Sequence, residues 1–120
     1  MTILIVEDNP LMREMIRETV GDLADVITEC ADGDEAFAAY QANFPNWVLM
    51  DIQMPRVDGF TASRQIRAAY PDAQICMVTA YGDARTRALA TDAGAKAFVL
   101  KENLEELRSL LGPAKGRLCQ

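Results

Sequence analysis

Histidine is absent from this chain of 120 residues, and cysteine occurs only three times. Without histidine the chain has neither a histidine base nor a histidine that could donate a phosphoryl group. Cys30, Cys76 and Cys119 are too few and too widely spaced for a metal quartet or a redox pair. Cys76 falls within an apolar run and is interpreted as a small core residue. Cysteine-based metal and redox sites are therefore excluded.

Long apolar runs and an excess of basic residues are also lacking. No apolar stretch approaches the ~20 residues that span a bilayer. The first residues lack the basic region and cleavage site of a signal peptide. We therefore expect a cytoplasmic protein with no membrane partner. The net charge of −6 argues against direct binding to nucleic acid, because phosphate backbones select for basic surfaces.

Length and composition predict one small domain. Hydrophobic residues make up 50% of the chain and charged residues 25%, which is ordinary for a globular protein that buries a core. No linker or low-complexity tract divides the sequence. We expect the domain to occupy residues 1–112 and residues 113–120 to form a short, frayed tail.

Four short apolar runs are the most informative feature of what is present. Because they lack the polar alternation of a half-exposed strand, they predict strands that are buried on both faces. Each run is followed by a residue that can do chemistry: 3–6 by Glu7 and Asp8, 47–50 by Asp51, 75–78 by Thr79, and 97–100 by Lys101. Parallel strands end at one edge of an open sheet, where such folds bind ligands, so these side chains should converge on one crevice.

The segments between the runs have helical periodicity. A fifth, less apolar strand is expected at Asp25–Cys30, at an edge of the sheet. Helices are expected over residues 10–23, 33–44, 59–70, 83–93 and 102–111. This alternation predicts an α/β fold with a five-stranded parallel, doubly wound sheet in the order 2-1-3-4-5, a flavodoxin-like three-layer architecture.

Two of the expected helices carry apolar stripes that should face the sheet. In the first helix the stripe comprises Leu11, Met12, Met15, Ile16, Thr19, Val20 and Leu23. In the second helix the inward residues are Ala36, Phe37, Tyr40 and Phe44. Pro10 suits the first turn of the first helix, with Asp8 or Asn9 as its cap, while the charged residues of that helix, Arg13 among them, should face solvent.

The three acids predict a divalent-cation site. Glu7, Asp8 and Asp51 cannot all be ionised at close range unaided, because like charges raise each other's pKa. A hard cation resolves this conflict, and carboxylate oxygens suit Mg²⁺. Since Mg²⁺ needs only one or two carboxylates, one remains free to attack phosphorus. Lys101 and Thr79 then fit as partners of the transferred phosphoryl oxygens.

The chain resembles the receiver domain of two-component response regulators from about residue 2 to residue 111. The match includes Ile-Val-Glu-Asp at 5–8, Asp-Ile-Gln-Met-Pro-Arg-Val-Asp-Gly at 51–59, Thr-Ala at 79–80, and Lys101. These pieces are highly specific in this order and spacing, and the loop at 51–59 is the strongest single piece.

The resemblance implies a role for each acidic position. Asp51 is implied to be the phosphoacceptor, which forms an aspartyl phosphate, and also a metal ligand. Asp8 is implied to bind Mg²⁺ directly, and Glu7 to act mainly through water. The backbone carbonyl of Gln53 is implied to be a further metal ligand.

The resemblance also implies a switch. Thr79 and Phe98 resemble a pair in which the hydroxyl moves toward the phosphoryl group and the ring turns inward. Lys101 resembles the lysine that pairs with the phosphoryl oxygens. Many family members have proline after this lysine, whereas here the next residue is Glu102, so we expect a trans peptide bond.

The function that the resemblance implies is signalling rather than turnover of an external substrate. The domain would accept a phosphoryl group from a phosphohistidine of a sensor histidine kinase or a histidine phosphotransfer protein, speed only its own phosphorylation and hydrolysis, and switch a face that binds a downstream protein. A phosphorylation-dependent homodimer is compatible with this interpretation. The alternative is a truncated receiver of a larger regulator, such as a DNA-binding one.

Other functional classes fit the residues less well. A phosphatase of the haloacid dehalogenase type would pair its nucleophile with a second acid two residues on, where this chain has Gln53. A flavodoxin-like carrier needs a hydroxyl- and glycine-rich phosphate loop, whereas residues 7–10 would repel phosphate without a metal. A degenerate receiver that only binds partners is disfavoured, because the acids, the hydroxyl and the lysine are all present. Tyr81 is interpreted either as a surface residue near the site or as a gate to it.

Overall fold

The computed structural model of the chain describes residues 1–112. Five strands form one sheet in the order β2-β1-β3-β4-β5, and every neighbouring pair is parallel. The strands are β1 (Thr2–Val6), β2 (Val26–Cys30), β3 (Trp47–Met50), β4 (Ile75–Thr79) and β5 (Ala97–Leu100). The fold class and strand order predicted from the sequence are confirmed.

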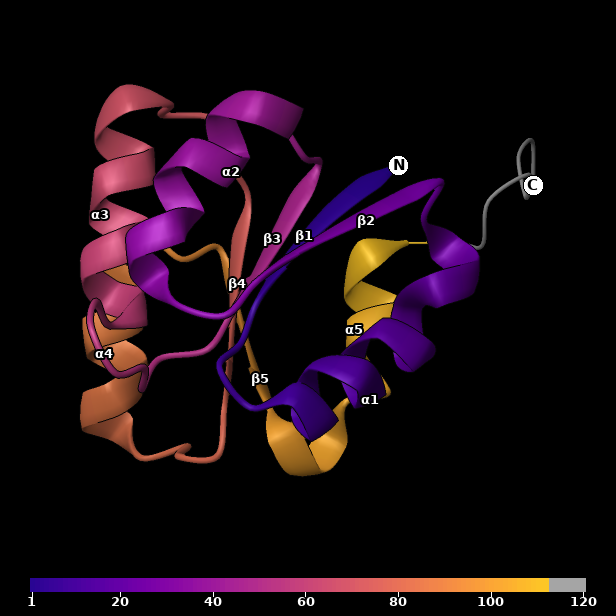
Figure 1. Cartoon of the computed structure of the whole chain (residues 1–120). Coiled ribbons are helices and arrows are strands. Elements are labelled where there is room, and N and C mark those ends of the chain that lie inside the picture. Colours follow the sequence, from indigo (N-terminus) through magenta and orange to yellow (C-terminus); the bar gives the residue numbers. More distant parts are fainter. Residues whose placement is uncertain (113–120) are drawn as a thin grey trace.

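In the described part of the chain, five α-helices connect or follow the strands. They are α1 (Pro10–Val20), α2 (Ala36–Asn43), α3 (Gly59–Ala69), α4 (Ala84–Asp92) and α5 (Glu106–Leu111), with 3₁₀ turns η1 (Gly21–Leu23), η2 (Gly33–Glu35) and η3 (Lys101–Asn103). Figure 1 shows α2, α3 and α4 on one side of the sheet and α1 and α5 on the other, which gives three layers. Within residues 1–112, no helix is both long enough and apolar enough to cross a membrane.

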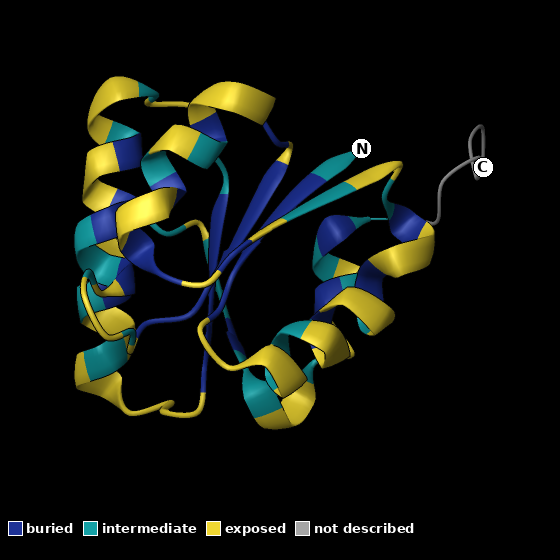
Figure 2. Cartoon of the chain, viewed as in Figure 1, coloured by how far each residue is buried: buried dark blue, intermediate teal, exposed yellow. Residues whose placement is uncertain are grey.

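The core has two halves because alternate residues of a strand point to opposite faces of the sheet. Leu4 and Met50 belong to the half that includes residues of α2, α3 and α4, whereas Ile5 and Leu49 belong to the half that includes residues of α1 and α5. All four side chains are at most 1% exposed. Figure 2 shows the central strands buried throughout and the outer faces of the helices exposed. Burial on both faces explains why the strand sequences show no polar alternation.

Helix α1 buries a narrower stripe than its periodicity predicted. Ile16 and Val20 are buried, but Leu11 is 67% exposed and Met15 44% exposed, so the prediction that these two face the sheet was wrong. Successive residues of a helix are rotated by about 100°. Leu11 and Met15 each precede a sheet-facing position by one residue and are therefore turned toward solvent.

Helix α2 ends one residue before Phe44, whose backbone is left-handed with a φ of 43°. Phe44 is 61% exposed, so the prediction that it faces the core was also wrong. Pro45 follows, and a residue before proline is disfavoured in the helical region. Ala36 and Tyr40 are buried as predicted.

The last helix begins later than predicted. Instead of a helix from Glu102, the chain forms η3 and then α5 from Glu106. Short-range hydrogen bonds, such as that from the Leu107 amide to the Leu104 carbonyl at 2.9 Å, join the two segments. Every peptide bond of residues 1–112 is trans, as expected for Lys101–Glu102. The tail predicted at 113–120 lies outside the described residues.

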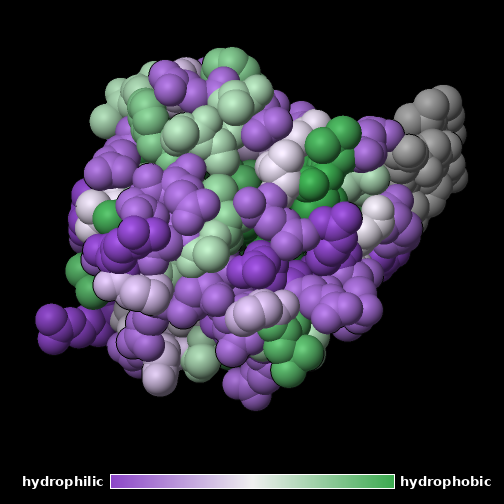
Figure 3. Space-filling view, in the orientation of Figure 1, coloured by the Kyte–Doolittle hydropathy of each residue, from purple (hydrophilic) through white to green (hydrophobic). Residues whose placement is uncertain are grey.

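Among residues 1–112, the exposed large hydrophobic side chains come from four separate parts of the fold, and only Leu11 and Met15 share an element. They are Leu11, Met15, Val26, Phe44 and Tyr81. Figure 3 accordingly shows hydrophobic side chains in separate groups among hydrophilic ones on the face in view. This face therefore presents no broad apolar patch.

Candidate functional site

Five side chains predicted from the strand ends lie at one edge of the sheet. Glu7 and Asp8 follow β1, Asp51 follows β3, Thr79 ends β4, and Lys101 follows β5. The strand registers align these ends, because the last residues of β1 and β3 are paired, as are the last residues of β4 and β5. The local reason is shared by all of them, since each follows or ends an apolar run that forms a buried strand.

These side chains line a single cleft of about 240 Å³. Its lining residues are Glu7, Asp8, Asn9, Asp51, Gln53, Thr79, Ala80, Tyr81 and Lys101. Tyr81 is 55% exposed, and Gln53 is also exposed, so both lie where the cleft opens to solvent. Phe98 is the one predicted site residue that does not line the cleft.

The acidic side chains of the cleft form a compact cluster. Glu7, Asp8 and Asp51 each offer a carboxylate oxygen, and these atoms lie within 4.8 Å of one another. Glu7 and Asp51 are buried, with exposed fractions of 0% and 5%, whereas Asp8 is exposed. Two buried acids and one exposed acid leave the cluster open on one side, so it could hold a metal ion.

Lys101 is the cation of this cluster. Its Nζ atom lies 3.0 Å from Glu7 Oε1 and 3.1 Å from Asp51 Oδ1. Burial alone would lower the pKa of Lys101, but the carboxylates of Asp51 and Glu7 outweigh it and raise the pKa. Because one ammonium faces three carboxylates, two negative charges remain unbalanced when all four groups are ionised.

The environment of Asp51 opposes its ionisation. Burial and then the neighbouring Glu7 carboxylate raise the pKa of Asp51 to about 7, although Lys101 acts in the opposite direction. The backbone N–H of Ile52 donates a hydrogen bond of 2.9 Å to Asp51 Oδ1. Glu7 Oε1 is buried, and its partner among the described residues is the Lys101 ammonium at 3.0 Å. Since that one ammonium is shared with Asp51, a further cation would find carboxylate charge that the protein does not balance.

Thr79 presents a hydroxyl group at the cleft. The side chain is buried, and its Oγ1 atom accepts a hydrogen bond of 3.2 Å from the backbone N–H of Tyr81. An accepting hydroxyl keeps its own proton, which it can donate to an anion in the cleft.

Phe98 lies on β5 outside the cleft, where it contacts α4. The guanidinium carbon of Arg87 is 4.5 Å from the centre of the Phe98 ring. The same guanidinium donates a hydrogen bond of 3.1 Å to the Gly82 carbonyl, in the segment between β4 and α4. Arg87 therefore joins the aromatic ring to the loop that leaves Thr79.

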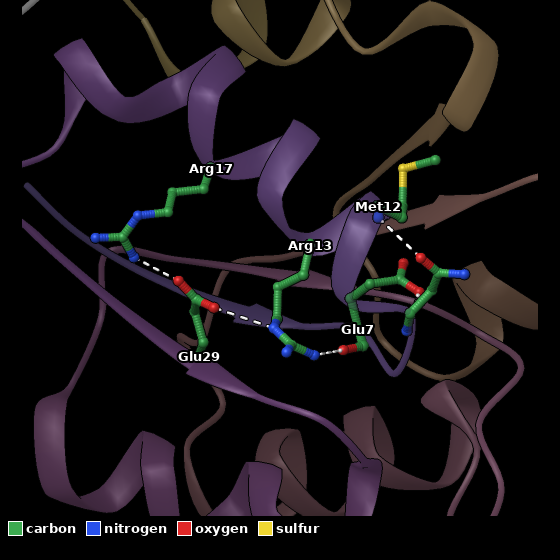
Figure 4. A network of polar contacts seen from close by, with 6 residues as sticks. Glu7, Met12, Arg13, Arg17 and Glu29 are labelled. Atoms are coloured by element: carbon green, nitrogen blue, oxygen red, sulfur yellow. Dashed lines mark hydrogen bonds and ion pairs between the residues drawn. The ribbon is translucent and has the colours of Figure 1, made fainter.

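A network that the sequence did not predict fixes the backbone at the end of β1. Arg13 donates a hydrogen bond of 2.7 Å to the Glu7 carbonyl and another of 3.0 Å to Glu29 Oε1, and Glu29 also pairs with Arg17 (Figure 4). The Arg13 side chain is therefore only 22% exposed and is bound to the backbone after β1, a contact that the helical periodicity does not predict. No local pattern distinguishes Arg13 from Arg17, because the extra partner of Arg13 is a backbone carbonyl that tertiary structure brings near.

The cap of α1 also lies at this site. Asn9 Oδ1 accepts a hydrogen bond of 3.0 Å from the Met12 amide, so Asn9 rather than Asp8 is the cap. The backbone N–H of Asn9 in turn donates a hydrogen bond of 3.2 Å to Glu7 Oε2. Asp8 is thus not used as a cap.

Comparisons with known proteins agree with this arrangement. The family described as "Response regulator receiver domain" matches residues 3–111. The chain belongs to this family. The resemblance drawn from the sequence is confirmed.

Individual relatives of this receiver domain differ in length. The chemotaxis protein CheY of Bacillus subtilis is 39% identical over 100 residues, which cover 82% of this chain and 83% of that protein. Response regulator MprA of Mycobacterium sp. (strain KMS) is 35% identical over 114 residues, which cover 91% of this chain and 50% of that protein. The receiver domain thus spans about half the length of its MprA relatives.

A solved structure shows the same fold. The crystal structure of the CheX-CheY-BeF3-Mg²⁺ complex from Borrelia burgdorferi matches with a TM-score of 0.81 and 25% sequence identity. The alignment covers 93% of this chain and 90% of that chain.

Proposed function

We propose that this receiver domain accepts a phosphoryl group on Asp51 from a phosphohistidine of a sensor histidine kinase or a histidine phosphotransfer protein. The observation that carries the proposal is the contact of the Asp51 carboxylate with Lys101 in an open cleft that holds two further acids. A carboxylate can attack phosphorus without a separate base. The backbone N–H of Ile52 also holds the Asp51 carboxylate in place.

We propose Mg²⁺ as the cofactor of this reaction. Asp8 and Asp51 would bind the ion directly, with the Gln53 carbonyl as a further ligand and Glu7 acting mainly through water. The cluster of carboxylate oxygens within 4.8 Å, with its two unbalanced negative charges, supports a hard divalent cation. The name of the related complex from Borrelia burgdorferi includes Mg²⁺ together with BeF3, a mimic of a phosphoryl group. The bound ion would neutralise charge on the phosphoryl oxygens.

The side chains of the cleft have defined parts in the transfer. An Asp51 oxygen forms a bond to phosphorus while the phosphorus–nitrogen bond of the phosphohistidine breaks, and the imidazole leaves with the electron pair. Lys101, now 3.1 Å from Asp51, pairs with a phosphoryl oxygen as charge moves outward. Water later releases inorganic phosphate, so the domain turns over no external substrate.

Thr79 and Phe98 would convert the modification into a change of surface. The Thr79 hydroxyl donates to the phosphoryl group and in doing so leaves its bond with the Tyr81 amide. Movement of this loop frees space beside β5, and the Phe98 ring turns inward away from Arg87. The altered face, which includes α4 and β5, would bind a downstream protein or a second copy of the domain.

A second candidate is that this receiver belongs to a longer regulator. The twofold length difference from MprA favours it. A solved structure that is 26% identical, from Staphylococcus aureus, is described as a DNA-binding response regulator of the LuxR family. The length of the open reading frame that encodes the chain would distinguish this arrangement from a single-domain regulator.

Phosphorylation by a small acyl phosphate tests the proposal. Wild-type protein with acetyl phosphate and Mg²⁺ should gain one phosphoryl group by intact mass, sensitive to hydroxylamine and absent when a chelator replaces Mg²⁺. Asp51→Asn should gain none. Asp58→Asn is the matched control, because Asp58 caps α3 from the same loop and asparagine is an equally good cap. Equal labelling of wild type and Asp51→Asn would reject the assignment.

A further inference from the structure

A fourth acid, Asp32, is as buried as Glu7 and Asp51 but does not line the cleft. Its exposed fraction is 3%, and it lies between the end of β2 and η2. Among the described residues, the buried polar and charged side chains are Glu7, Asp32, Asp51, Ser63 and Thr79. Of the three acids in this set, only Asp32 is left without a part in the proposed chemistry.

The carboxylate of Asp32 is satisfied by backbone N–H groups. Oδ1 accepts a hydrogen bond of 3.0 Å from the Arg56 amide, and Oδ2 accepts one of 3.0 Å from the Val57 amide. Oδ2 also accepts from the Asp34 amide at 3.2 Å. Burial alone would raise the pKa of Asp32, but these hydrogen bonds outweigh it and lower the pKa, so the group is an anion at neutral pH.

The amides of Arg56 and Val57, which are far from Asp32 in the sequence, belong to the loop that carries the proposed phosphoacceptor. This loop runs from Asp51 to Asp58 between β3 and α3 and includes Gln53. Its base is closed by a hydrogen bond of 2.8 Å from the Gly59 amide to the Ile52 carbonyl. The middle of the loop has no helix or strand of its own to hold it.

Gly33, the residue after Asp32, also lies against this loop. A Cβ atom at Gly33 would lie 2.3 Å from the Val57 carbonyl oxygen, closer than side chains pack. The absence of a side chain at this position therefore lets the loop approach the start of η2 closely. Asp32 thus binds the N–H of Val57, and Gly33 leaves room for the C=O of the same residue.

We propose that Asp32 is a positioning residue that holds the loop of residues 51–58 so that the Gln53 carbonyl faces the acidic cluster, and that it thereby sets the Mg²⁺ affinity of the cleft. The inference rests on the proposed function of the cleft. Asp32 touches neither metal nor phosphorus, and it acts through the backbone of Arg56 and Val57.

Loss of the Asp32 carboxylate should raise the Mg²⁺ concentration needed rather than abolish the chemistry. In Asp32→Ala the loop amides lose their acceptor, so the Gln53 carbonyl is no longer held at the cluster. We expect the Mg²⁺ concentration for half-maximal phosphorylation to rise at least fivefold, with the limiting rate at saturating Mg²⁺ within twofold of wild type. For Asp32→Asn we expect a Mg²⁺ requirement between those of wild type and Asp32→Ala. The side-chain oxygen of asparagine still accepts a hydrogen bond, whereas its NH₂ group is a donor that faces a backbone N–H group.

Asp34→Ala provides a matched control within the same turn. The Asp34 side chain is exposed and forms an ion pair of 3.2 Å with the Arg56 side chain. Its replacement by alanine retains the hydrogen bond from the backbone N–H of residue 34 to Asp32. We expect an unchanged Mg²⁺ titration for this variant. Each variant is titrated with Mg²⁺ by Trp47 fluorescence and, separately, in the acetyl phosphate reaction, at a temperature where circular dichroism shows it folded.

The outcomes separate positioning from stability. Lower melting temperatures with wild-type Mg²⁺ titrations in both Asp32 variants would overturn the inference, as would an equal effect of Asp34→Ala. If Asp32→Ala does not fold, the titration of Asp32→Asn decides. A wild-type protein that binds Mg²⁺ but gains no phosphoryl group would reject the proposed function, and the fluorescence titration would still decide the role of Asp32. A wild type that binds no Mg²⁺ would overturn the inference.

Discussion

Removing the charge of Asp51 should stabilise the metal-free fold. Asp51 is 5% exposed and lies beside the Glu7 carboxylate, which is fully buried. Asn has nearly the same shape as Asp but carries no charge. In Asp51→Asn, Lys101 retains its ion pair with Glu7, so the exchange removes an unbalanced anion and leaves the remaining pair intact.

The sign and size of the effect follow from the pKa of Asp51, raised from 3.8 to about 7 by burial first and by Glu7 second. Between these values the folded state binds more protons than the unfolded state, so the free energy of unfolding falls as pH rises through that window. The interval corresponds to about 4 kcal/mol. Because Asp51 titrates together with its neighbours, we expect about half of this, roughly 2 kcal/mol, as the gain in Asp51→Asn at pH 8.

Urea unfolding followed by Trp47 fluorescence in the presence of a chelator measures this effect. The advantage of Asp51→Asn over wild type should be largest near pH 8 and should vanish near pH 4. At pH 8, added Mg²⁺ should reduce the difference in unfolding free energy between the two proteins, because a ligand that binds the folded wild type stabilises that protein by mass action. Asp72→Asn, at an exposed turn, is the control and should show no such pH dependence. A variant less stable than wild type at pH 8, or a difference independent of pH, would refute the reasoning.

Three further predictions concern Mg²⁺ binding, the coupling between Thr79 and Phe98, and the lifetime of the phosphoryl group. Asp8→Ala should weaken Mg²⁺ binding at least tenfold, about 1.4 kcal/mol, and an unchanged titration by Trp47 fluorescence would reject Asp8 as a direct ligand. Thr79→Ala should still accept a phosphoryl group, yet beryllofluoride should not shift the amide resonances of α4 and around Phe98 as in wild type; a wild-type response would refute the coupling. Tyr81→Ala should lose its phosphoryl group faster if the exposed ring shields the path of water in line with the phosphorus–oxygen bond. Equal or slower release of phosphate would make Tyr81 a partner-facing surface residue instead.

The residues of the cleft were predictable because each is tied to the end of a buried strand. The runs before Asp51 and Thr79 are apolar at every position, a pattern that is typical of a strand covered on both faces. Once the strands are parallel, their ends share an edge, and the side chains that follow must meet there. Proximity within the cleft was therefore a consequence of periodicity and topology, without knowledge of any side-chain contact.

The exposed faces of the helices were less predictable. Leu11, Met15 and Phe44 are apolar, yet all three are more than a third exposed. Periodicity selects a stripe but does not fix its width, which depends on how closely the helix approaches the sheet. The start of α5 was also predicted too early, since the chain forms the 3₁₀ turn η3 after β5 and the α-helix begins only at Glu106.

The contacts of Arg13 with Glu7 and of Asp32 with the loop of residues 51–58 were not predicted from the sequence, because the groups contacted there belong to the backbone. Arg13 donates to the Glu7 carbonyl, and Asp32 accepts from the Arg56 and Val57 amides, which are more than twenty residues away. A side-chain pattern carries no information about which distant N–H or C=O group will lie nearby. The two glycines at which a Cβ would meet this loop, Gly33 and Gly59, are the nearest available signal.

The edge strand β2 explains how a cleft of repelling charges keeps its geometry. The cleft acids oppose folding, so the loops that carry them must be held by groups outside the cluster. β2 and the residue pair after it supply two anions for this purpose: Glu29 holds Arg13 against the Glu7 carbonyl, and Asp32 holds the Val57 amide. The polar composition that marked β2 as an edge strand thus serves the site through Glu29, because a fully apolar strand would leave Arg13 without this partner.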